Sequence, residues 1–195
     1  MKKRAKSYFL LAEQYGETAN LLLETLCNNG NTTWGIGNTQ KEAEEKMQRN
    51  ASKSDSSLFV PAIFLCLQST ELFIKGILLL NEVEIDGKHD MQHAFGELEK
   101  LYSPTSPLYK EFKRMYHCQK EIMKQYRDDN HITNSHDLYM SLRYPEKVNP
   151  HHTPYTYYAL MHNGEEGIKL FSSIQKNLSN IKNAVLEEYN RLFDN

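Results

Sequence analysis

The sequence predicts an all-α protein: an antiparallel bundle of four to five long helices with an extended or hairpin-like insertion at about residues 131–163. Apolar residues recur at spacings of three and four along several long segments, which is typical of amphipathic helices. Prolines and a change of periodicity interrupt this pattern in the insertion. The 195 residues suffice for one domain with a sizeable core, residues 1–195. The segments with helical periodicity are residues 5–28, 58–81, 91–102, 107–128 and 165–193.

The first predicted helix, residues 5–28, carries its apolar residues on one side and ends at the turn-forming residues 28–31. The polar segment that follows begins with the loop-like stretch TTWGIGNT. Thr39 and Glu42 then form a capping box in front of a short, solvated helix. A lone tryptophan in a loop usually folds back onto the core, so this is the expectation for Trp34, although an exposed binding role is the alternative.

The stretch LFVPAIFLCLQSTELFIKGILLLN, residues 58–81, is apolar on nearly every side. Such a helix is either a membrane span or the central helix of a packed domain. Polar residues interrupt the apolar run well before the length that a span requires, so we expect a central helix and no membrane association. Glu71 and Lys75 stand four residues apart, in the favourable order for an ion pair with a structural role. The helix is expected to begin near Asp55 or Ser56.

The segments after the central helix are separated by clear breaks. Asp86-Gly87 indicates a turn, Asp90 can cap a helix over residues 91–102, and SPTSP ends that helix. The helix over residues 107–128 carries a basic stripe, diluted by acidic residues, that is typical of a solvated face.

The insertion departs from helical periodicity. Residues 138–144 alternate between apolar and polar, which predicts a half-buried strand, and TPYTYYAL (153–160) predicts a second strand of a small hairpin. The helix over residues 165–193 then completes the bundle.

Two stretches, QSTELFIKGILLLN (68–81) and HDMQHAFGELEKLY (89–102), resemble the second and third helices of a HEPN domain. The tetrad LRYP (142–145) is also similar to HEPN proteins that carry such an insertion. The resemblance implies a helical bundle, a homodimer, and a link to RNA or nucleotide chemistry. It further implies a setting in a prokaryotic stress, toxin–antitoxin or phage-defence system, with a nucleotidyltransferase encoded nearby as partner.

HEPN ribonucleases pair an Arg with a His a few residues later, without a metal. In that pair the Arg stabilises charge on the phosphate and the His transfers a proton. The pair Arg127 and His131 is about one position too close for the family motif, and Arg143 and His151 are too far apart. We therefore expect a non-catalytic binding module, with a metal-independent endoribonuclease that uses one of these pairs as the alternative.

Other chemistry has little support in the sequence. His89 and His93 stand four apart, as zinc ligands do on a helix, but no Glu base accompanies them, and structural histidines are the expectation. Hydrolase and phosphate-loop motifs are absent, so no metal or other cofactor is predicted. The three cysteines lack a pairing pattern and are expected to be reduced in a cytoplasmic protein. A net charge of -2 excludes a globally basic nucleic-acid surface.

The insertion therefore holds the candidate ligand site. Its tyrosines are interleaved with Arg143 and several histidines, a combination that can stack on bases and bind phosphate. Alternatively, these tyrosines close the end of the bundle, and both interpretations remain open. A third possibility is a purely structural protein that uses an apolar edge for dimerisation. The predicted ligand-binding residues are Arg143, Tyr144, His152 and Tyr155.

Overall fold

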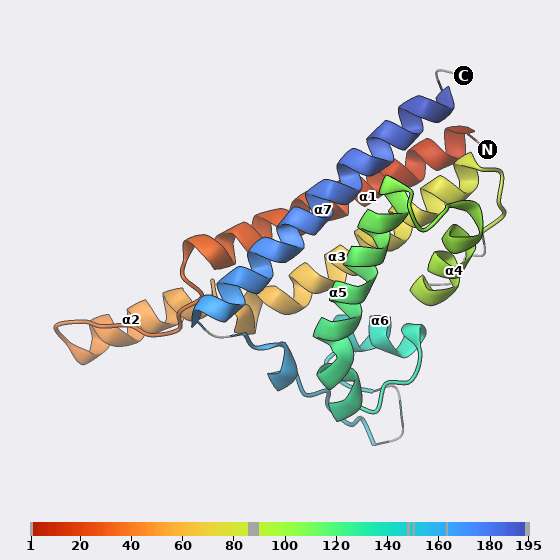
Figure 1. The fold of residues 1–195 in the computed structure, drawn as a ribbon. Coiled ribbons are helices and arrows are strands. Elements are labelled where there is room, and N and C mark those ends of the chain that lie inside the picture. Colours follow the sequence, from red (N-terminus) through yellow and green to blue (C-terminus); the bar gives the residue numbers. More distant parts are fainter. Residues whose placement is uncertain (1, 86–89, 148, 150, 163, 194–195) are drawn as a thin grey trace.

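The computed structural model describes residues 2–85, 90–147, 149, 151–162 and 164–193. The predicted all-α class is confirmed (Figure 1). The elements in chain order are α1 (Lys2–Asn28), α2 (Gln40–Ala51), α3 (Asp55–Leu80), α4 (Met91–Leu101), α5 (Pro107–Asp129), α6 (Ser135–Arg143), the 3-10 helix η1 (Tyr158–Leu160) and α7 (Gly164–Phe193).

Helix α3 is the centre of the bundle, as its all-round apolar character predicts. Every residue from Phe73 to Leu80 is buried, and α3 packs against α1, α4, α5, α6 and α7. Figure 1 shows α1 and α7 running alongside α3, while α5 leads to α6 at the far side. By length and composition alone, the helical stretch Gln40–Leu80 could cross a membrane, but 78% of its most apolar window is buried in the protein.

The predicted helix starts are confirmed where a side chain caps the backbone. Thr39 Oγ1 accepts a hydrogen bond from the Glu42 amide at 3.2 Å, and Asp90 Oδ1 accepts one from the His93 amide at 3.1 Å. Helix α3 begins at Asp55, with Ser54 as its N-cap residue. The predicted turn at Asp86-Gly87 lies outside the described residues.

The predicted strand over residues 138–144 is wrong, because this segment is helical in α6. The Asn134 side chain caps the helix by accepting a hydrogen bond from the Asp137 amide at 2.8 Å. Leu138, Tyr139 and Leu142 are all buried, and their spacing of one, three and four residues places them on one helix face, whereas in a strand the adjacent Leu138 and Tyr139 would point to opposite faces. The Asn134 cap and the burial of adjacent Leu138 and Tyr139 therefore both favour the helix over the strand.

The second predicted strand, over residues 153–160, is also wrong. Among the described residues, β pairing is limited to an isolated bridge between Glu146 and Pro154, and residues 158–160 form η1. A hairpin-like turn does exist: the Lys147 amide bonds to Thr153 O at 2.8 Å and the Tyr155 amide to Pro145 O at 2.9 Å. The prolines restrict this hairpin to a turn, because they lack the N–H that a ladder needs.

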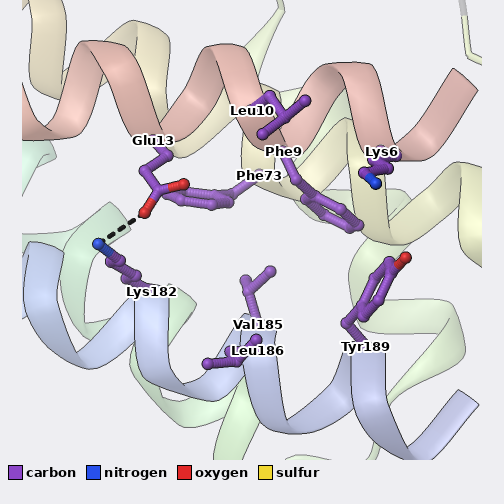
Figure 2. A pocket seen from close by; sticks show the side chains of 9 residues that line it. All are labelled: Lys6, Phe9, Leu10, Glu13, Phe73, Lys182, Val185, Leu186 and Tyr189. Carbon is purple, nitrogen blue, oxygen red and sulfur yellow. Dashed lines mark ion pairs between the residues drawn. The ribbon is translucent and has the colours of Figure 1, made fainter. Parts of the chain in front are cut away.

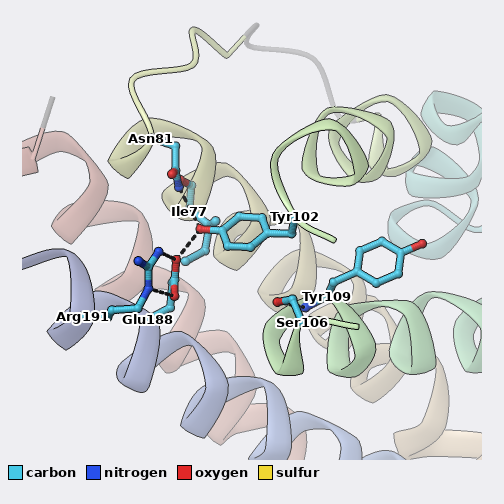
Figure 3. A network of polar contacts seen from close by, with 7 residues as sticks. All are labelled: Ile77, Asn81, Tyr102, Ser106, Tyr109, Glu188 and Arg191. Carbon is cyan, nitrogen blue, oxygen red and sulfur yellow. Dashed lines mark hydrogen bonds and ion pairs between the residues drawn. The ribbon is translucent and has the colours of Figure 1, made fainter. Parts of the chain in front are cut away.

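A polar network at the end of the bundle away from the insertion joins the ends of α3 and α4 to α7 (Figure 3). Tyr102, which follows α4, donates a hydrogen bond to Glu188 Oε1 at 2.6 Å and accepts one from Asn81 Nδ2 at 2.9 Å. Arg191 donates to both Glu188 oxygens, at 2.8 and 2.6 Å. Arg191 is the main cause that holds the pKa of Glu188 below its ordinary value, so this carboxylate stays charged and fixes the end of α4 against α7.

The expectation that Trp34 folds back onto the core is wrong. Its side chain is 80% exposed, in the extended segment between α1 and α2. The backbone that follows Trp34 packs closely against α2 at Gly35 and Gly37.

Candidate functional site

A buried polar group connects the insertion to the central helix. Lys75 Nζ lies 2.7 Å from Glu71 Oε1, which confirms the predicted ion pair, and Tyr139 of α6 donates a hydrogen bond to Glu71 Oε2 at 2.5 Å. Burial and the neighbouring Glu71 carboxylate raise the pKa of Tyr139 well above its ordinary value. Tyr139 therefore stays a proton donor and holds α6 on α3.

The insertion is also fixed at the end of α5 by the buried side chain of Asn130. Its amide nitrogen donates hydrogen bonds to Tyr126 O and to Thr156 O, both at 2.9 Å, and its oxygen accepts one from the Thr156 amide at 2.8 Å. Lys147 Nζ donates to the Asn130 carbonyl at 2.8 Å. One asparagine thus brings together segments that are 26 residues apart in the chain.

The tyrosines of the insertion divide between the two interpretations left open by the sequence. Tyr157 donates hydrogen bonds to Ser141 O at 2.7 Å and to Tyr144 O at 3.2 Å, and its ring stacks on Tyr126 at 5.6 Å between centroids. Tyr139 and Tyr157 therefore close the end of the bundle. Tyr144 and Tyr158, in contrast, are exposed.

These contacts shape a pocket of about 260 Å³, which we call the histidine pocket. His131 contributes from the residue after the α5 cap, in a left-handed conformation with φ 55°, and His136 contributes from the first turn of α6. Lys147 Nζ lies 5.9 Å from the centroid of the Tyr155 ring, so a cation and an aromatic face share the pocket. The lining residues are Asn130, His131, Ile132, His136, Asp137, Met140, Lys147, Asn149 and Tyr155.

Arg143 lies on the same face of α6 as this pocket. His136, Met140 and Arg143 are spaced by four and three residues, so they follow one another along the helix. The guanidinium of Arg143 lies 5.4 Å from the centroid of the Tyr144 ring. His152 Nδ1 is 3.1 Å from Glu146 Oε1, and His151 is exposed nearby in the same turn.

The structure separates the first Arg and His pair that the sequence suggested. Arg127 Nε donates a hydrogen bond to Ile132 O at 3.2 Å, and its side chain lines a different pocket, of about 120 Å³, with Tyr116 and Ser135. His131 lines the histidine pocket. Arg143 and His151 are both exposed, and no contact joins them among the residues the structure describes.

Of the predicted site residues, His131 and Tyr155 come together in the histidine pocket, and Arg143 with Tyr144 lies beside it. His136, Lys147 and Asn149 line the pocket but were not among the predicted ligand-binding residues. The sequence spacing of these three residues does not indicate a shared pocket, because His136 lies on α6 and Lys147 and Asn149 lie in the turn that follows it. Within the described part of the chain, no group of three or more His, Cys, Asp or Glu side chains could hold a metal; His89 lies outside it.

A second buried polar cluster lies where α1, α3 and α7 meet. Asn31 Nδ2 donates a hydrogen bond to Asp55 Oδ2 at 3.2 Å, and Asn31 Oδ1 accepts one from the Asp55 amide at 2.8 Å. The His162 amide donates to Asp55 Oδ2 at 2.5 Å, and the His162 ring lies edge-on to Phe59 at 5.1 Å. Burial lowers the pKa of His162, and the Asp55 carboxylate opposes this shift only in part.

The lowered pKa of His162 predicts a pH dependence of stability. His162 therefore binds its proton at a higher pH in the unfolded chain than in the folded protein. The stability that the neutral His162 side chain contributes is full above its unfolded pKa, about 6.5, and is lost as the pH falls through its pKa in the folded protein. We expect His162→Gln to reduce the loss of unfolding free energy between neutral and mildly acidic pH. Chemical denaturation at several pH values measures this, with the exposed His151→Gln as control; equal slopes for wild type and His162→Gln would contradict it.

The arrangement as a whole defines a class of protein: a helical bundle whose central E-L-x-x-K helix anchors a polar, histidine-rich insertion. A family model for the HEPN domain matches residues 39–169, more than half of the chain, and the chain belongs to that family. No curated protein and no solved structure matches the chain.

Proposed function

We propose that this HEPN protein is an RNA- or nucleotide-associated binding module that holds its ligand in the histidine pocket. The setting we propose is a prokaryotic stress, toxin–antitoxin or defence system, in the cytoplasm, with the protein acting as a homodimer beside a nucleotidyltransferase. The observation that carries the binding proposal is the gathering of His131, His136, Lys147 and Tyr155 around one pocket.

The chemistry of these groups suits a phosphate joined to a base. Lys147 and Arg143 supply cationic groups, and each lies near the ring of a tyrosine. Single-stranded nucleic acids are bound in this way, by cations along the backbone and aromatic faces under the bases. The chain as a whole is slightly acidic, so the attraction must be local.

Binding is a better proposal than cleavage by the pairs that the sequence suggested. A metal-independent ribonuclease needs the Arg and the His at one phosphate, whereas Arg127 and His131 line different pockets. The side chain of Arg127 is also engaged with the carbonyl of Ile132.

The test is the binding of a fluorescently labelled short single-stranded RNA, measured by anisotropy at fixed salt and in EDTA. The double variant His136→Ala/Arg143→Ala is expected to bind at least about tenfold more weakly, because a hydrogen bond to a charged group contributes about 1.5–3 kcal/mol. Both side chains are exposed, so the fold should be retained.

The control is Lys113→Ala/Lys124→Ala, which removes two exposed charges from α5 outside the pocket and should change the affinity little. Equal weakening by both double variants would mean that only overall charge matters, and would overturn the site. Cleavage of the RNA by the wild type, lost in Arg127→Ala/His131→Ala, would replace binding by the nuclease alternative.

A further inference from the structure

Residues 32–52, which we call the arm, stand away from the rest of the bundle as an extended segment followed by α2 (Figure 1). The arm presents two large apolar side chains to solvent: Trp34 is 80% exposed and Ile36 is 88% exposed. Exposing both on one short segment forgoes burial that stabilises by about 1.5–3 kcal/mol for a large apolar side chain. Neighbouring exposed apolar side chains of this size mark an interaction surface.

The backbone beneath these side chains is fixed by close packing. A Cβ added to Gly35 would lie 2.4 Å from the Met47 amide nitrogen, and one added to Gly37 would lie 2.5 Å from the Ala43 amide nitrogen. Only glycine permits this approach of the extended segment to α2. The two glycines alternate with Trp34 and Ile36 along the segment. The backbone at the glycines therefore packs against α2, while the side chains of Trp34 and Ile36 point to solvent.

Hydrogen bonds from α2 hold the carbonyls of the two exposed residues. Lys46 Nζ donates to Ile36 O at 3.0 Å, and Asn50 Nδ2 donates to Trp34 O. The two side chains are thus presented on a preorganised support, which lowers the entropy cost of docking them into a partner.

A concave apolar surface lies at the other end of the molecule, between the first half of α1 and the last half of α7 (Figure 2). This groove has a volume of about 300 Å³, and two of its residues, Leu10 and Leu186, are 52% and 57% exposed. The Glu13–Lys182 ion pair, at 2.7 Å, lies at one end of it. Its apolar lining consists of Phe9, Leu10, Phe73, Val185, Leu186 and Tyr189.

The arm cannot reach the groove of its own chain. Helix α1 rises about 1.5 Å per residue, so the stretch from Phe9 to Asn28 separates the two features by roughly 28 Å of helix before the arm begins. Trp34, Ile36 and all but one of the groove residues also lie outside residues 39–169, so this pair of features does not belong to the segment that matches the family model.

We infer that the groove of one chain receives Trp34 and Ile36 from a second copy of the same chain. A convex and a concave apolar surface on one molecule, too far apart to meet, are complementary only between molecules. When two copies lie antiparallel, each arm extends toward the groove end of the other, and the two contacts close into a twofold dimer. The groove is large enough for one big aromatic side chain and its neighbour.

The charges of the arm favour a protein occupant over a phosphate-bearing one. The arm carries three basic residues, Lys41, Lys46 and Arg49, against three acidic ones, Glu42, Glu44 and Glu45. An arm that attached to RNA or to an anionic lipid surface would have an excess of basic residues. Here the apolar contact is the attraction, and the neutral arm adds no repulsion against an identical chain.

Trp34 is the only tryptophan in the chain, so its fluorescence reports directly on the arm. As the concentration of the full chain rises through the micromolar range, we expect the emission to shift to the blue in step with dimer formation, measured by sedimentation. Leu186→Arg, which leaves the arm intact, should abolish the shift and raise the dimer dissociation constant at least about tenfold. The matched control is Leu21→Arg, a change at a side chain of α1 that is 63% exposed and outside the groove; it should behave as wild type.

Mixing the arm variant Trp34→Ala/Ile36→Ala with Leu186→Arg tests the pairing itself, because that mixture retains one intact arm and one intact groove. A heterodimer should form although neither variant dimerises alone. A dimer with unchanged tryptophan emission, or a wild type that stays monomeric, would overturn the inference. So would a blue shift that appears only when vesicles of anionic phospholipid are added.

Discussion

Replacing Glu71 by alanine is expected to lower the free energy of unfolding by about 3–5 kcal/mol, because it breaks a buried ion pair by removing one of the two partners. Lys75 and Glu71 are almost fully buried, at 2.7 Å from one another. The hydrogen bond from the Tyr139 hydroxyl to Glu71 Oε2 would be lost in the same change. Urea denaturation followed by circular dichroism measures the loss.

Two further variants separate the ion pair from the rest of the packing. Tyr139→Phe should cost only about 1–3 kcal/mol, since a neutral hydroxyl is removed while the ion pair remains. Glu45→Ala, in the exposed Lys41–Glu45 pair at 4.0 Å, should change stability by less than about 0.5 kcal/mol. A loss for Glu71→Ala no larger than that of the exposed pair would contradict a structural role for the buried one.

The helices could be predicted from the sequence because their signals are local. Thr39 and Asp90 cap the helices that follow them, and the three- and four-residue periodicity of α1, α5 and α7 spans many turns. Helix α6 was mistaken for a strand because nine residues are too few to separate the two periods. The Asn134 cap that decides the matter lies just before the segment.

The site could be predicted only in part, because its geometry depends on contacts between distant residues. The histidines and tyrosines marked the insertion, and His131 and Tyr155 do share a pocket. Lys147 joins them because its ammonium bonds the Asn130 carbonyl, 17 residues earlier in the chain. Nothing in the neighbourhood of either residue indicates that contact. Trp34 shows the same limit: its apolarity predicts burial, but the segment that carries it packs on α2 through Gly35 and Gly37, and the indole stays exposed.

Asn130→Ala is expected to weaken RNA binding at least about tenfold, although the variant retains all the side chains that we propose to contact the ligand. The variant removes both hydrogen bonds to the Thr156 backbone, which are partly buried, at a cost of roughly 1–3 kcal/mol. The lost hydrogen bonds are the ones that hold the insertion to the end of α5. The segment around Lys147 and Tyr155 should then open more often than the bundle unfolds.

Hydrogen exchange distinguishes this local opening from general destabilisation. In Asn130→Ala, the amides of Lys147, Tyr155 and Thr156 should exchange faster, while those in the middle of α3 keep their protection. Tyr102→Phe serves as the matched control, because it removes a partly buried polar contact at the end of the bundle away from the insertion and should leave both the insertion and RNA affinity unchanged. If Asn130→Ala bound RNA as the wild type does, the ligand would have to lie away from the histidine pocket. Retained affinity together with faster exchange would have the same meaning, since it would show that binding does not depend on the order of the insertion.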